Sequence, residues 1–136
     1  MVQMSRQRSV TPYVMVHSAT AFMDFTRRTF DAEIRNVNHV SEDSELVLHA
    51  EAWIGDSPVF FGDSSAQGEQ CQPPYRPGQD PATIQMWVNV PDAGETFARA
   101  VAAGATPVME VEEQEDGRLG GVIDPFGTLW WFSTAN

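Results

Sequence analysis

Histidine and cysteine are the side chains of this sequence that most often act as metal ligands or nucleophiles. His49 has a carboxylate neighbour on the same face of its predicted strand, because Glu51 follows two residues later. Such a pair could supply half of a metal site, transfer a proton, or form a hydrogen bond on a sheet surface, and we favour the hydrogen bond. Cys71 is the single cysteine and has no histidine near it, so we expect an unreactive thiol and no internal disulfide.

A second set of candidate residues mixes aromatic rings with a few polar groups. Alternation along the predicted strands places them on one sheet face, while the opposite face is small and aliphatic and should pack on helices. A concave face of this composition suits an apolar or aromatic small molecule, although the rings could equally fill a core or a dimer interface. No catalytic residue is assigned. The predicted ligand-binding residues are Tyr13, His49, Glu51, Trp53, Phe60, Gln85, Trp87 and Trp131.

The elements that would position these residues occur twice along the chain. The first set is a strand at 11–17, a helix at 19–30, a weak strand at 33–38 and a hairpin at 46–54 and 58–61. The second set is a strand at 83–90, a helix from 91 to 104, a strand at 106–111 and a hairpin at 119–123 and 128–132. Neither half could bury its own sheet face, so two half-domains must pack together.

Two local patterns make further predictions. In the strand at 46–54, alternation points Leu48, Ala50, Ala52 and Ile54 toward the helices. The acidic run at 110–116 indicates a solvated loop. Calcium binding is the alternative, although the spacing does not match an EF-hand loop.

Composition excludes several classes of function. The 136 residues include 19 acidic residues and 8 basic ones, all of them arginine, for a net charge of −11. A polyanion of this kind is repelled by nucleic acid and by anionic membranes. The absence of lysine excludes Schiff-base chemistry.

We find no secretory signal pattern and no apolar run that could span a membrane, so we expect a cytoplasmic protein.

The paired modules and their local motifs resemble the vicinal oxygen chelate superfamily, which includes glyoxalase I, bleomycin-resistance proteins and extradiol dioxygenases, and in particular its PhnB-like branch. The resemblance spans residues 11–133. It implies an α+β fold in one domain over 1–136, with two βαβββ modules (11–63 and 83–133, joined by 64–82), cupped mixed sheets, outer helices and a homodimer. The matching motifs are 11–13 (TPY), 21–25 (AFMDF), 49–51 (HAE), 54–57 (IGDS), 97–105 (FARAVAAGA), 117–120 (GRLG), 124–127 (DPFG) and Trp130.

The resemblance also implies where a metal would bind, and the residues at those positions are unsuitable. They are Thr11, Phe60 (or Val59), Gln85 and Trp131. Phe60 and Trp131 offer no ligand atom for a divalent ion. We therefore expect no metal and no cofactor, and a protein that binds a small apolar, aromatic or cationic molecule. The alternatives are a metal-dependent lyase, isomerase or dioxygenase that uses His49 and Glu51, and a regulatory partner domain.

Overall fold

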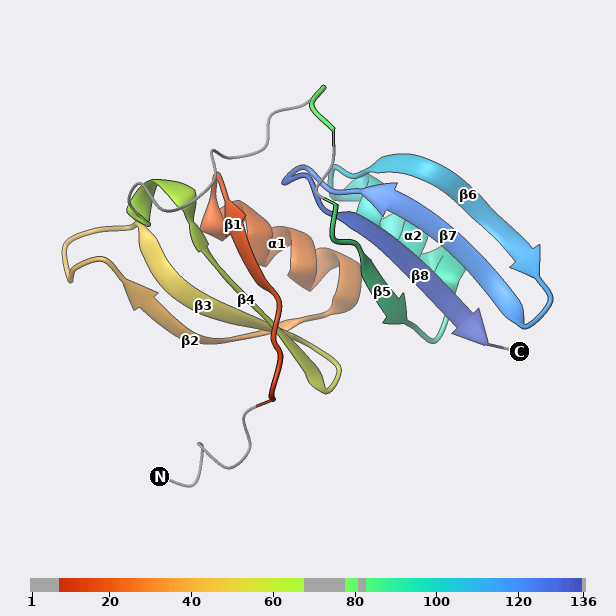
Figure 1. Ribbon diagram of the computed structural model, residues 1–136, viewed down its shortest axis with the longest axis horizontal. Coiled ribbons are helices and arrows are strands. Elements are labelled where there is room, and N and C mark those ends of the chain that lie inside the picture. Colours follow the sequence, from red (N-terminus) through yellow and green to blue (C-terminus); the bar gives the residue numbers. More distant parts are fainter. Residues whose placement is uncertain (1–7, 68–77, 81–82, 136) are drawn as a thin grey trace.

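The computed structural model describes residues 8–67, 78–80 and 83–135, which form two four-stranded mixed sheets side by side (Figure 1). The strand order is β1-β4-β3-β2 in the first sheet and β5-β8-β7-β6 in the second, and the first-named pair of each sheet is parallel. The predicted α+β fold of two βαβββ modules is confirmed. The elements are β1 (Tyr13–Val16), α1 (Ala19–Phe30), β2 (Glu33–His39), β3 (Val47–Ile54), β4 (Ser57–Asp63), β5 (Met86–Asn89), α2 (Ala93–Ala102), β6 (Thr106–Gln114), β7 (Gly117–Ile123) and β8 (Leu129–Ala135).

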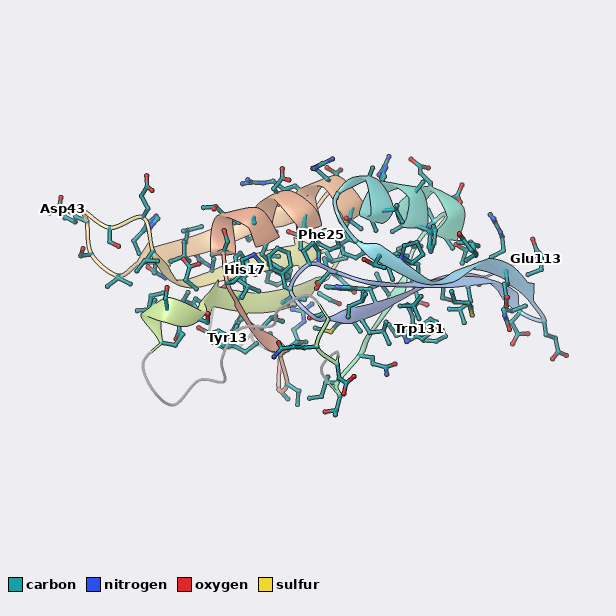
Figure 2. All side chains as sticks on the ribbon, turned by 90° about the horizontal axis from the view of Figure 1, so that it is seen from above. Tyr13, His17, Phe25, Asp43, Glu113 and Trp131 are labelled. Atoms are coloured by element: carbon teal, nitrogen blue, oxygen red, sulfur yellow. The ribbon has the colours of Figure 1, made fainter. Side chains whose placement is uncertain are left out.

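Capping side chains begin both helices at equivalent points of the two modules. The Ser18 hydroxyl accepts a hydrogen bond from the backbone N–H of Ala21, and the Asp92 carboxylate accepts one from Glu95. Each bond satisfies an N–H group that has no partner within its own helix. Both helices lie on the same side of the sheets (Figure 2), so each sheet has a helix-covered face and an open face.

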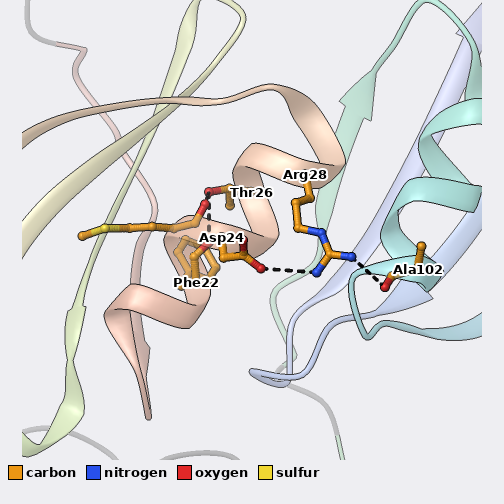
Figure 3. Close-up of polar contacts among 6 residues, drawn as sticks. Phe22, Asp24, Thr26, Arg28 and Ala102 are labelled. Atoms are coloured by element: carbon orange, nitrogen blue, oxygen red, sulfur yellow. Dashed lines mark hydrogen bonds and ion pairs between the residues drawn. The ribbon is translucent and has the colours of Figure 1, made fainter.

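The core lies between the helices and the sheets and continues across the two modules. The Phe30 ring of α1 packs on Trp130 of β8, with ring centroids 4.9 Å apart, and Phe22 meets Phe126 at 5.3 Å. Arg28 adds a polar connection, since one of its nitrogens lies 3.3 Å from Asp24 and another donates to the carbonyl of Ala102 at 3.0 Å (Figure 3). These contacts hold α1 beside α2.

Asp124 organises the turn between β7 and β8. Its carboxylate accepts hydrogen bonds from the backbone N–H groups of Phe126 and Thr128 and from the indole Nε1 of Trp130, at 2.8, 2.9 and 2.8 Å. Burial raises the pKa of Asp124 above its ordinary value, and these hydrogen bonds oppose the rise. One buried carboxylate therefore holds both the turn and the largest ring of the core.

Two sequence predictions about strands are wrong. The acidic run does not form a loop throughout, because β6 continues to Gln114 and pairs with β7 as far as Gly117. In β3, Val47 is fully buried while Leu48 is 43% exposed, because a register irregularity near Asn38 shifts the alternation at that end.

Cys71 lies outside the described residues. None of the helices in the described ranges is long and apolar enough to cross a lipid bilayer.

Replacing Asp124 with alanine should lower the free energy of unfolding by about 2–4 kcal/mol, because three buried donors lose their acceptor. Urea unfolding followed by far-UV circular dichroism would measure the change. The matched control is Glu112→Ala, which removes an exposed carboxylate from β6 and should change stability by less than about 0.5 kcal/mol. Equal effects from the two variants would contradict the assigned role.

Candidate functional site

The open face of the first sheet carries a cluster of three rings from three neighbouring strands. Tyr13 of β1 lies opposite Phe60 of β4, and His49 comes from β3 beyond it. The His49 ring lies 4.8 Å from Phe60 and 5.4 Å from Tyr13, and the Tyr13 hydroxyl is 3.1 Å from His49 Nδ1. Tyr13 is 48% exposed, so the cluster is open to a ligand.

The expected hydrogen bond between His49 and Glu51 is replaced by two other pairs. His49 pairs with Tyr13, and Glu51 accepts a 2.9 Å hydrogen bond from the indole Nε1 of Trp53. Both pairs use neighbours that strand alternation places on the same face, but the partners differ from the predicted ones. The predicted hydrogen bond between His49 and Glu51 is therefore wrong.

Two arginine side chains stack on Trp53. The guanidinium carbon of Arg35 lies 4.4 Å from the centre of the Trp53 ring, and that of Arg8 lies 5.3 Å away. Arg35 also donates a hydrogen bond to Glu33, and this bond raises the pKa of Arg35 and lowers that of Glu33. The Trp53 ring thus interacts with two cations, which favours positive charge next to this indole.

The second sheet carries two tryptophans on its open face, and each is fixed by a hydrogen bond. The indole Nε1 of Trp131 donates to the Gln85 side chain at 2.8 Å, and that of Trp87 donates to Asn89 at 3.2 Å. The Trp131 ring lies against its cross-strand partner Gly121, where an added Cβ atom would be only 2.6 Å from the ring. Gly121 is therefore needed for this ring position.

The predicted binding residues fall into two sets on the same side of the molecule. Figure 2 shows Tyr13 below the first sheet and Trp131 below the second, both on the side away from the helices. The first set comprises Tyr13, His49, Glu51, Trp53 and Phe60, and the second comprises Gln85, Trp87 and Trp131. Each sheet therefore presents its own part of an open aromatic face.

The side chains at the four implied metal positions do not fit a divalent ion. Phe60, Val59 and Trp131 have no free electron pair to donate, and the Gln85 oxygen already accepts the Trp131 indole. Thr11 and Gln85 are the two of the four that carry a side-chain oxygen, and both are neutral. The described part of the chain also contains no group of three His, Cys, Asp or Glu side chains that could hold a metal.

Comparisons with known proteins give a consistent family. A family model for the C-terminal domain of glyoxalase At5g48480-like proteins matches residues 89–133. An uncharacterized protein from Mycobacterium bovis is 34% identical over 125 residues, which cover 90% of this chain and 80% of that protein. The chain belongs to the glyoxalase/bleomycin resistance/dioxygenase superfamily.

Solved structures show the same superfamily fold. A PhnB protein from Bacillus cereus superposes with a TM-score of 0.69 and 18% identity, covering 94% of this chain and all of that one. A member of the superfamily from Sphaerobacter thermophilus gives a TM-score of 0.63 and 16% identity, covering 95% of this chain and 98% of that one. At these identities, the likeness of the structures establishes the fold alone.

Two residues on the open face of this superfamily member were missed by the sequence reasoning. Arg35 follows Glu33 by two residues in β2 and therefore shares its face, so a closer analysis of that weak strand could have placed both near Trp53. Arg8 precedes β1 and belongs to no periodic segment, so no sequence pattern indicates its position over Trp53.

Replacing Gly121 with alanine should move the Trp131 indole and break its hydrogen bond to Gln85, because the new methyl group occupies the ring's position. In ¹H–¹⁵N NMR spectra, the Trp131 indole signal should shift, whereas that of Trp130, which is bound to Asp124, should stay. The free energy of unfolding should fall by about 1–3 kcal/mol.

The matched control for this variant is Gly94→Ala. A Cβ atom there would be 3.2 Å from the end of the flexible Arg118 side chain, which can move aside. The control should leave both indole signals in place. An unmoved Trp131 signal in the Gly121→Ala variant would contradict the arrangement described here.

Proposed function

We propose that this superfamily member binds a small apolar, aromatic or cationic molecule on the open aromatic faces of its sheets, without a metal ion. The observation that carries the proposal is the stacking of two guanidinium groups on Trp53. An indole that attracts two protein cations in water would also attract a cationic or aromatic ligand, since the same ring quadrupole acts on each.

The fixed orientation of three tryptophans supports this proposal. The indole N–H groups of Trp53, Trp87 and Trp131 are each bonded to a nearby side chain. A ring held in this way loses little conformational freedom when a ligand packs on it, so more of the contact energy contributes to affinity. The polar edges of these indoles are satisfied. The rings of Trp87 and Trp131 are largely or partly exposed, and at Trp53 a ligand would compete with Arg8 and Arg35.

The net charge of −11 supports a preference for cations over anions. Near Trp53 the carboxylates are Glu33 and Glu51, and Arg35 is paired with Glu33. A metal-dependent reaction is not part of the proposal, because two of the four implied ligand positions carry no donor atom and the other two, Thr11 and Gln85, are uncharged.

We also propose that the protein acts as a homodimer in which the open faces of two copies cover one another. Trp87 is 59% exposed and Tyr13 is 48% exposed, so the monomer leaves two aromatic rings of this face in contact with solvent. A second copy would bury these rings and convert open sheet faces into enclosed cavities.

Three probes with the same naphthalene ring should bind in the order of their charge. The cation 1-naphthylmethylammonium should bind most tightly, 1-naphthalenemethanol less tightly and the anion 1-naphthoate most weakly, as measured by isothermal titration calorimetry. Arg8→Ala should tighten binding of the cation about two- to fivefold, because Arg8 no longer competes for the Trp53 ring. Binding should be unchanged by EDTA.

Arg27→Ala is the matched control for charge. Arg27 is an exposed residue of α1, on the helix side of the sheets, so the variant makes the same change in net charge away from the open face. Equal effects of the two arginine variants, or an anion that binds as tightly as the cation, would show that Trp53 does not select the ligand.

Sedimentation velocity should show a species of twice the monomer mass. Trp87→Ala should shift this species toward the monomer, because it removes the most exposed ring of the open face. Val108→Ala, an exposed position on the edge strand β6, should leave the dimer intact. A protein that remains monomeric at high concentration would refute the dimer while leaving the ligand proposal open to its own test.

A further inference from the structure

A pocket of about 600 Å³ lies at the junction of the two modules, apart from most of the open aromatic face. Its walls come from the end of α1, the turn between β3 and β4, the strand β5 and the helix α2. Within the described ranges, β5 pairs only with β8, and its other edge is unpaired on the side that faces the first module. Figure 1 shows the β3–β4 turn and β5 on either side of this junction.

The pocket differs in chemistry and position from the faces described above. Trp87 is the only predicted binding residue that lines it. Much of its wall is apolar and includes Ile54, Met86 and Val88. Because Thr29 and Phe30 of α1 contribute to the wall, the pocket extends to the helix side of the sheets.

A buried hydroxyl group in the pocket wall has no hydrogen-bond partner. Thr29 is 1% exposed, and its Oγ1 is the buried side-chain atom without a partner among the described residues. Thr26, one turn earlier in α1, shows the usual solution, because its hydroxyl donates to the carbonyl of Phe22 at 3.0 Å (Figure 3). An unpaired buried hydroxyl destabilises the folded state, so its presence next to a pocket points to a partner that is not part of the chain.

We propose that this junction pocket is a second binding site, for a compact apolar molecule with one neutral hydrogen-bonding group such as a hydroxyl or a carbonyl. Thr29 would bind that group, and the apolar wall would bind the rest of the molecule. A neutral group fits because the pocket lining carries the carboxylates of Asp31 and Asp56, which disfavour an anion, and because Arg99 is already paired with Glu95.

Thr29 Oγ1 is covered by protein in the unliganded chain, so a neighbouring side chain must move when the ligand binds. Met86 in the wall is unbranched and adapts its shape readily. A volume of about 600 Å³ is within the usual range of small-molecule sites. The site requires both modules, so a bound ligand would also stabilise their relative position.

Three probes of similar size test this proposal: 2-phenylethanol, acetophenone and ethylbenzene. Methyl NMR with signals from Met86 and Val88 should show that the alcohol and the ketone bind at the junction, about three- to tenfold more tightly than ethylbenzene. Thr29→Val should abolish this preference. The same variant should raise the Tm of the unliganded protein by about 3 °C, because the unpaired hydroxyl is replaced by a methyl group.

Thr26→Val is the matched control, since it makes the same substitution in the same helix at a hydroxyl that already has a partner. It should lower the Tm and leave the probe preference unchanged. The proposal is overturned if none of the probes shifts the Met86 and Val88 signals, or if Thr29→Val retains the preference for the alcohol and the ketone. The signals of Tyr13 and Trp131 separate this site from the open face, so each proposal can fail alone.

Discussion

Contacts between aromatic rings of the two modules determine how the sheets lie side by side. Phe30 packs on Trp130 and Phe22 meets Phe126. Trp130, Phe22 and Phe126 belong to one buried cluster on the helix side, and the partly buried Phe30 packs against it. Each module is too small to bury its sheet alone, so the shared cluster supplies the apolar burial that both need. Two features follow from this arrangement. The other faces of both sheets remain open in the same direction, and a pocket remains beside the free edge of β5.

Most of the fold could be predicted from the sequence, because local signals identify most of its elements. Ser18 and Asp92 are good N-cap residues, and both helices begin directly after them. The prediction failed where side chains do not report the pairing of the backbone. The end of β6 is rich in exposed carboxylates such as Glu112 and Glu113, so it lacks the alternation typical of a strand, yet its backbone pairs with β7.

The candidate site could be predicted only as a set of residues that share a face. Alternation places Tyr13, His49 and Phe60 together, and their rings are in contact. The partners of individual side chains could not be predicted, because they depend on the strand order. Glu51 accepts from Trp53, two residues further along its own strand, whereas His49 is bonded to the Tyr13 hydroxyl of another strand of the same sheet, so spacing along one strand does not decide the partner.

The two proposed sites differ in what a ligand would supply, because the polar groups are hydrogen-bonded on the open face and one is unbonded in the junction pocket. On the open face, the indole N–H groups of Trp53, Trp87 and Trp131 are all bonded, while their rings remain partly or largely exposed. A ligand ring or cation would add contact on the exposed parts of these rings, and at Trp53 it would compete with Arg8. In the junction pocket the apolar wall is in place, and the hydroxyl of Thr29 lacks a hydrogen bond. A ligand there must bring a polar group, so one compound is not expected to satisfy both sites.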